Sequence, residues 1–181
     1  MFLGAKLGKP RDFSSLVLSE GSAAELMCKR RGEMAELAFM HKAMLKGFRV
    51  AKPWGDSDRF DLVIAFDHLL WRIQVKSVWT KRVGYYVNSC PTNNKTYTFQ
   101  EIDFLVAYLG PEELWYILPV SVLHHNRIYL SPWSRRKSQF AKYIEAWCLF
   151  RGEQPDEPIF PISRRKNVLP VTDAAPNDAT L

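Results

Sequence analysis

Two apolar runs, residues 60–66 and 69–78, constrain the fold of this chain more than any other segment. Both are typical of β-strands, and the two-residue step between them predicts a hairpin. Each run also carries polar side chains that an apolar strand does not need. Asp61 opens the first run, while Gln74 and Lys76 lie two residues apart in the second and so point to the same face of the sheet. The pattern predicts a carboxylate, an amide and an ammonium group on adjacent strands.

These groups are of the kinds that metal-assisted phosphodiester cleavage uses. Magnesium prefers a few oxygen ligands and keeps open positions for water and substrate. Asp61 is the best ligand candidate, and the amide oxygen of Gln74 and the backbone carbonyl of Val75 are further candidates. Lys76 can orient or deprotonate the attacking water, or stabilise charge in the transition state. An Asp or a Lys alone at a strand end is commonplace in structural sheets, so the combination carries the hypothesis.

The rest of the chain predicts a mixed α/β domain whose central sheet contains antiparallel hairpins. Helical spacing of apolar residues begins after the capping-box pattern at residues 22–25 and continues to about residue 46, with Gly32 expected to split it into two helices. Further strands are expected over residues 48–51, 84–88, 104–109, 114–120 and 127–130, and a closing helix over 137–150.

The 181 residues are enough for one domain. We expect an irregular N-terminal segment at 1–21, the main folded domain at 22–151, and a Pro-rich, disordered tail at 152–181. No apolar run approaches the ~18 residues of a membrane helix, so no membrane partner is expected. The three widely spaced cysteines are most simply reduced thiols, which favours a cytoplasmic protein.

Basic residues are distributed unevenly along the chain, whose formal net charge is +6. No acidic residue occurs between Asp67 and Glu101, or between Glu113 and Glu145. One-sign segments can build a polyanion-binding face, although solvated surface charge is an equally good explanation of the charge alone. The candidate DNA-binding residues are Arg72, Lys81, Arg82, Lys95, Arg135, Arg136 and Lys137.

Five short motifs follow one another in a fixed order: Gly-xxx-Glu at 32–36, Gly-Phe at 47–48, Pro-Trp-Gly-Asp at 53–56, Phe-Asp at 60–61 and Gln-Val-Lys-Ser at 74–77. In this order and spacing they resemble the PD-(D/E)xK endonuclease superfamily. The resemblance is to Holliday-junction resolvases and, more closely, to a small endonuclease group that includes an intron homing endonuclease. The later segments extend the resemblance to roughly residues 30–150.

This resemblance implies a restriction-endonuclease-like core, a mixed central β-sheet flanked by helices. It also implies a magnesium site, with manganese as a substitute, in which Glu36 is the helical carboxylate and Glu33 the second choice. Two positions depart from the superfamily pattern. Phe60 replaces the usual proline, and Gln74 replaces the acidic residue two before the lysine. A neutral amide binds magnesium more weakly than a carboxylate does.

The sequence therefore predicts a magnesium-dependent endodeoxyribonuclease with DNA as its partner and no small-molecule substrate. Making a double-strand break with one site per chain favours a homodimer. The alternative is a catalytically inactive nucleic-acid-binding module on the same fold, and a third hypothesis is a partner-binding protein with a nuclease-like fold. Duplex, junction and damaged DNA all fit, as do homing, restriction, repair and mobile-element roles.

Overall fold

The computed structural model describes residues 20–55, 57–90, 95–133 and 138–156. Its elements are α1 (Glu20–Leu45), β1 (Arg49–Ala51), β2 (Leu62–Phe66), β3 (Leu69–Val78), β4 (Tyr85–Asn88), β5 (Phe104–Leu109), η1 (Gly110–Glu112), β6 (Leu114–Pro119), η2 (Val120–Val122), β7 (Arg127–Leu130), η3 (Ala141–Tyr143) and η4 (Trp147–Arg151), where η denotes a 3-10 helix. The expected irregular start before residue 20 and the expected tail beyond residue 156 lie outside the described residues.

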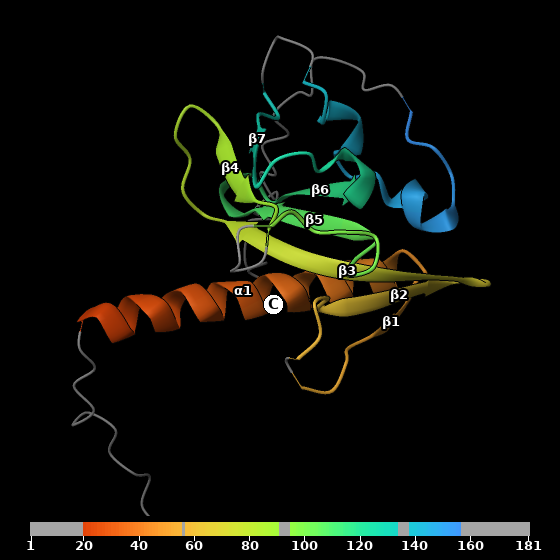
Figure 1. Cartoon of the computed structure of the whole chain (residues 1–181), viewed down its shortest axis with the longest axis horizontal. Coiled ribbons are helices and arrows are strands. Elements are labelled where there is room, and N and C mark those ends of the chain that lie inside the picture. Colours follow the sequence, from red (N-terminus) through yellow and green to blue (C-terminus); the bar gives the residue numbers. More distant parts are fainter. Residues whose placement is uncertain (1–19, 56, 91–94, 134–137, 157–181) are drawn as a thin grey trace, which may run out of the picture.

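A five-stranded sheet forms the centre of the domain, in the order β1-β2-β3-β5-β6. β3 runs parallel to β5, and the other neighbouring strands in this sheet are antiparallel. Strands β4 and β7 pair separately as a two-stranded antiparallel ribbon, which Figure 1 shows on the other side of β3 from α1. The mixed sheet with its flanking helix confirms the predicted fold class.

The predicted hairpin of β2 and β3 is confirmed. The two strands are antiparallel, with Phe66 opposite Leu69 at the turn and Leu62 opposite Ile73 near the other end. Asp67 takes the left-handed backbone conformation that the tight turn requires, with φ of 50°, and aspartate tolerates this conformation better than most residues. This register decides which β3 residues lie beside the start of β2.

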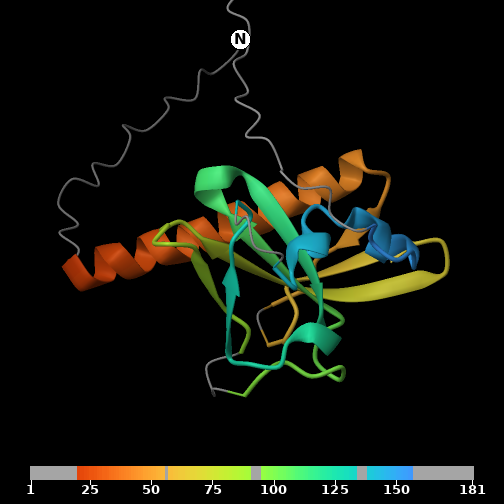
Figure 2. The same ribbon diagram turned by 90° about the horizontal axis from the view of Figure 1, so that it is seen from above.

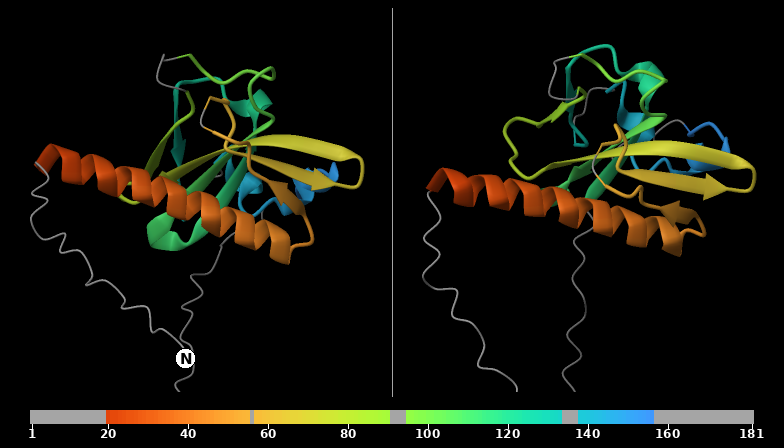
Figure 3. Two further views of the ribbon diagram at one scale, coloured as in Figure 1. Left: turned by 90° about the horizontal axis from the view of Figure 1, so that it is seen from below. Right: turned by 60° about the horizontal axis from the view of Figure 1, so that its bottom comes forward.

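Helix α1 is a single continuous helix, so the expected break at Gly32 and the expected start at the capping box are both wrong. A glycine costs a helix only about 1 kcal/mol, and packing beyond it offsets that cost. Ala35, Phe39 and Ala43 form the buried stripe, and the Phe39 ring lies 5.2 Å from the ring of Trp147. Figures 2 and 3 show α1 along one side of the sheet, with its N-terminal half extending past the strands.

The expected closing helix over residues 137–150 is also wrong, because the described part of this segment forms the short helices η3 and η4 instead. Glu145 interrupts them with a left-handed φ of 50°. Its carboxylate accepts a hydrogen bond from the backbone N–H of Trp115 at 3.1 Å and from the indole N–H of Trp147 at 2.7 Å. The apolar spacing in this segment therefore reflects aromatic residues buried by tertiary contacts rather than one face of a helix.

Candidate active site

Asp61 is held in place by the strand that follows it in the hairpin. Its backbone N–H donates to the carbonyl of Ile73 at 2.8 Å, which extends the β2–β3 ladder by one residue. The side-chain oxygen Oδ2 then accepts the backbone N–H of Val75 at 2.7 Å and the amide N–H of Gln74 at 2.5 Å. Both bonds use the same oxygen, which leaves Oδ1 outside this pair of contacts. The structure thus brings Asp61 and Gln74 into direct contact.

Burial and a neighbouring carboxylate make the Asp61 carboxylate electrostatically costly. Burial is the main cause that raises its pKa above the ordinary range, and the negative charge of Glu36 raises the pKa further. The Val75 N–H, the positive charge of Lys76 and the Gln74 amide oppose this rise. The net shift is upward, so added positive charge beside Asp61 would stabilise its ionised form.

Glu36 projects from α1 towards the same region and is paired with a lysine that the sequence did not indicate. The Lys52 ammonium lies 2.6 Å from the Glu36 carboxylate, whose side chain is only 19% exposed. Hydrogen bonding to Glu36 is the main cause that raises the Lys52 pKa, and the charges of Glu36, Asp61 and Glu33 add to it. Lys52 therefore sits in the field of three carboxylates. Glu33 is exposed, and among the three its effect on Lys52 is the smallest.

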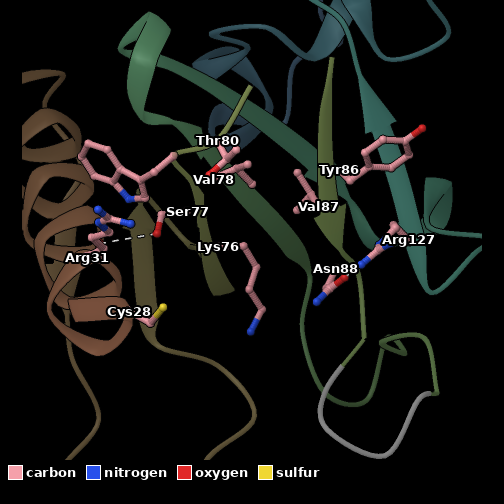
Figure 4. A pocket seen from close by; sticks show the side chains of 11 residues that line it. Cys28, Arg31, Lys76, Ser77, Val78, Thr80, Tyr86, Val87, Asn88 and Arg127 are labelled. Atoms are coloured by element: carbon pink, nitrogen blue, oxygen red, sulfur yellow. Dashed lines mark hydrogen bonds between the residues drawn. The ribbon is translucent and has the colours of Figure 1, made fainter. Parts of the chain in front are cut away.

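Lys76 lies two residues beyond Gln74 on β3, half-buried, and close enough to Asp61 to lower the pKa of that carboxyl group. Its ammonium group lies 6.0 Å from the centre of the Tyr97 ring. Tyr97 is buried, and burial followed by the charge of Asp61 raises its pKa to about 12, so the phenol stays neutral at physiological pH. Lys76 also lines a cavity of about 320 Å³ between α1 and the β4–β7 ribbon (Figure 4).

The donor set fits a small hard cation. Asp61 and Glu36 provide carboxylates whose like charges already interact, and the Val75 carbonyl and the Gln74 amide lie beside them. Oxygen donors of these types are the ones that magnesium selects. Within the described part of the chain, no three His, Cys, Asp or Glu side chains gather closely enough to hold a metal by themselves. An amide or carbonyl oxygen is therefore needed beside the two carboxylates.

Comparison with known proteins decides the family. A model of the PD-(D/E)XK endonuclease family matches residues 26–150, a range that contains all the site residues described above. The chain belongs to the PD-(D/E)XK endonuclease family. Among solved structures it is similar to a bacterial homing endonuclease, I-Ssp6803I, with 33% sequence identity, a TM-score of 0.61, and coverage of 67% of this chain and 90% of that one. A search of curated proteins found no match.

The candidate DNA-binding residues of this endonuclease family member differ in their surroundings: some are held in ion pairs and others are exposed. Arg72 has a structural role, because its guanidinium pairs with Asp103 at 3.0 Å and donates to the backbone carbonyls of Phe99 and Gln100. Lys81 pairs with Glu112 at 2.5 Å. Two others, Arg82 and Lys95, are exposed, whereas Arg135, Arg136 and Lys137 lie outside the described residues, as does Asp56 of the Pro-Trp-Gly-Asp motif.

Two residues near the site, Lys52 and Tyr97, were missed by the sequence reasoning. Lys52 directly follows β1 and precedes the Pro-Trp-Gly-Asp motif, so its position next to a recognised motif was the available signal. Tyr97 is buried although it lies in the polar, turn-rich segment after β4. The signal available in the sequence was an aromatic side chain within that polar segment.

Within the described residues no helix is long and apolar enough to cross a membrane.

Proposed function

We propose that this chain is a metal-dependent DNA endonuclease that hydrolyses phosphodiester bonds, with magnesium as its ion and manganese as a substitute. The observation that carries the proposal is the contact of Asp61 with Gln74 and Val75, beside Glu36 and Lys76. In support, all of these residues lie within residues 26–150, the range that matches the model of the endonuclease family to which the chain belongs. The 33% identical homing endonuclease supports DNA as the substrate.

Asp61 and Glu36 would hold the ion, with the Val75 carbonyl as a third donor. Glu33 is the second choice for the helical carboxylate. A bound divalent ion in such a site supplies Lewis-acid stabilisation of the phosphate and a more acidic water. Because Asp61 Oδ2 already accepts two hydrogen bonds, Oδ1 is the oxygen left for the ion. Gln74 presents its amide nitrogen to Asp61, so it would act as a ligand only after its amide rotates to present the oxygen.

Lys76 would position the attacking water or stabilise the charge that develops on the phosphate. Its location supports both roles, because it lies close enough to Asp61 to affect that carboxyl group and lines the adjoining cavity. The ring of Tyr97 lies on one side of the Lys76 ammonium. Since that phenol remains neutral at physiological pH, it does not compete with Asp61 for the positive charge.

A homodimer also belongs to this proposal. The outer face of α1, opposite the buried stripe, exposes Met27, Met34, Leu37 and Met44, which are between 49% and 67% exposed. Their spacing of seven, three and seven residues is that of a coiled-coil seam in which Arg30 and His41 occupy the two intervening positions. An exposed apolar surface of this kind marks an interaction site. A second copy packed along this face would provide the second active site that a double-strand break requires.

The test is incubation of purified protein with supercoiled plasmid in magnesium, in manganese and in EDTA. We expect nicked or linear DNA with either metal and none in EDTA, and no cleavage by the matched Asp61→Asn variant. Absence of cleavage by the wild type in both metals would refute the proposal. Salt-sensitive retention of DNA under those conditions would then favour the non-catalytic nucleic-acid-binding module.

A further inference from the structure

The two acid-free segments of the sequence pair with each other. β4 comes from the first segment, between Asp67 and Glu101, and β7 from the second, between Glu113 and Glu145. The register is Tyr86 opposite Tyr129 and Asn88 opposite Arg127. These four side chains form the exposed face of the ribbon, and none of them is acidic.

The inward face fixes the ribbon to the domain. Tyr85, Val87, Ile128 and Leu130 alternate with the exposed residues and are at most 3% exposed. An isolated two-stranded ribbon is only marginally stable, so this burial is what makes the ribbon a fixed platform. The outward face is therefore held in a defined position relative to the core.

The outward residues are organised by contacts with one another. The Arg127 Nε–H donates to the Asn88 side-chain oxygen at 3.4 Å, and its guanidinium lies 5.7 Å from the centre of the Tyr86 ring. The Tyr86 and Tyr129 rings are 5.2 Å apart. Gly84 makes room for the Tyr129 ring, because a Cβ at that position would come within 2.5 Å of it. The face therefore has a polar end and an aromatic end. The Arg127 charge lies against an amide and a ring, and no carboxylate of the described residues forms an ion pair with it.

This face adjoins the candidate active site. In Figure 4, Tyr86, Asn88 and Arg127 stand on one side of the cavity and Cys28 and Arg31 of α1 on the other, with Lys76 between them. Because Lys76 and the ribbon residues line the same cavity, a polyanion bound there can contact both. The cavity thus links the positive ribbon face to the residue proposed to act on the phosphate.

We propose that the β4–β7 ribbon enters the major groove of duplex DNA and that Asn88 and Arg127 read base edges there. The proposal rests on the function proposed above and names the part of the chain that selects the sequence. The major groove admits a two-stranded β-ribbon. Arginine pairs in a bidentate way with guanine and asparagine with adenine, so the polar end of the ribbon has the side chains that such reading requires. The two tyrosines contact the flanking backbone and sugar.

The experiment uses a duplex library with a randomised segment, cleaved by the full chain in magnesium, followed by sequencing of the new ends. The wild type is expected to show base preferences within about one helical turn of the cut. Asn88→Ala and Arg127→Ala should each reduce the preference at one or two positions by about 5- to 150-fold, the range that one bidentate contact provides. Cleavage summed over the library should persist in both variants.

Arg49→Ala is the matched control. It also removes one exposed arginine, but from β1, at the far edge of the five-stranded sheet, where its side chain bonds to the carbonyl of Asp67. It should keep the wild-type preferences. Unfolding midpoints are measured for all variants, because Asn88 and Arg127 are exposed and their truncation should leave the fold intact.

The outcomes separate the two proposals. If the wild type neither binds nor cleaves DNA, the proposed function fails and this inference fails with it. If the wild type cleaves without base preference, or if both ribbon variants keep the wild-type preference, the inference is refuted while the function stands. Loss of the same preferences in Arg49→Ala would also refute it, since the effect would then be one of net charge.

Discussion

Replacing Asp61 by asparagine separates the structural role of this residue from its proposed catalytic role. Asp61 accepts two hydrogen bonds through Oδ2, from the Val75 N–H and the Gln74 amide. An asparagine oxygen can accept both of these bonds. Its amide nitrogen would then replace Oδ1, the oxygen proposed to face the metal ion. The substitution thus keeps the local hydrogen bonds and removes the charge and one ligand.

The expected effects on activity and stability have opposite signs. Loss of a metal ligand removes several kcal/mol of transition-state stabilisation, so the cleavage rate of Asp61→Asn should fall by at least about 100-fold. Its free energy of unfolding at neutral pH should equal or exceed that of the wild type, because the fold raises the pKa of this carboxyl and so disfavours its ionised form. Asp61→Ala should instead be less stable by about 1 to 3 kcal/mol, since two donors lose their acceptor in a part-buried site.

The pH dependence tests the same reasoning. Below the ordinary pKa of aspartate, Asp61 is protonated in both the folded and the unfolded chain, and the wild type and Asp61→Asn should be about equally stable. As the pH rises through the raised pKa of the folded state, the wild type must ionise a buried group and loses stability relative to the variant. At higher pH the difference becomes constant.

Urea unfolding from pH 3 to pH 8 measures these differences, and plasmid nicking at saturating magnesium measures activity. A cleavage rate for Asp61→Asn within about tenfold of the wild-type rate would refute the metal-ligand role. An Asp61→Asn variant no more stable than Asp61→Ala would refute the hydrogen-bond argument, because only the first keeps an acceptor for Val75 and Gln74.

Three further substitutions test the remaining parts of the site and the assembly. Lys76→Ala should abolish cleavage but keep DNA binding in EDTA, as measured by gel shift. Binding should persist because one cation contributes only part of the electrostatic attraction to the phosphates. Loss of folding in this variant would mark Lys76 as structural. Gln74→Ala should raise the magnesium concentration at half-maximal cleavage and lower the maximal rate, whereas an unchanged titration would make Gln74 a sheet residue only. Leu37→Lys on the outer face of α1 should convert the dimer to a monomer in sedimentation equilibrium. Arg49→Ala is the control and should stay dimeric. A monomeric wild type would refute the proposed dimer.

The parts of the fold that the sequence predicted were those governed by local pattern. The β2–β3 hairpin followed from two apolar runs and a short turn, and its register brought Asp61 to Gln74 and Val75. The failures came from long-range packing. The described residues 138–150 have helical spacing, yet Trp147 and Phe150 pack against Phe39 of α1. Glu145 interrupts the segment and accepts hydrogen bonds from Trp115 and Trp147.

Partners distant in the sequence were likewise beyond local reasoning. Arg72 looked like a phosphate contact because it lies in an acid-free segment, but its partner Asp103 is brought to it by the parallel pairing of β3 with β5. Lys52 and Glu36 are separated by the end of α1 and all of β1, and only the folded chain places them 2.6 Å apart. Charge segregation along a sequence therefore indicates a surface, whereas the ion pairs of individual residues depend on topology.

The amide at position 74 has a physical rationale in the charge balance of the site. Burial raises the pKa of Asp61, the charge of Glu36 adds to this rise, and a third carboxylate at position 74 would raise the pKa further. Gln74 instead donates a hydrogen bond that lowers this pKa and so favours the ionised ligand. Lys52 supplies positive charge beside Glu36 in the absence of a metal ion. Because its side chain is flexible and partly exposed, it can move away from Glu36 when an ion binds. The departure from the acidic motif thus exchanges one direct ligand for a residue that keeps Asp61 charged and oriented.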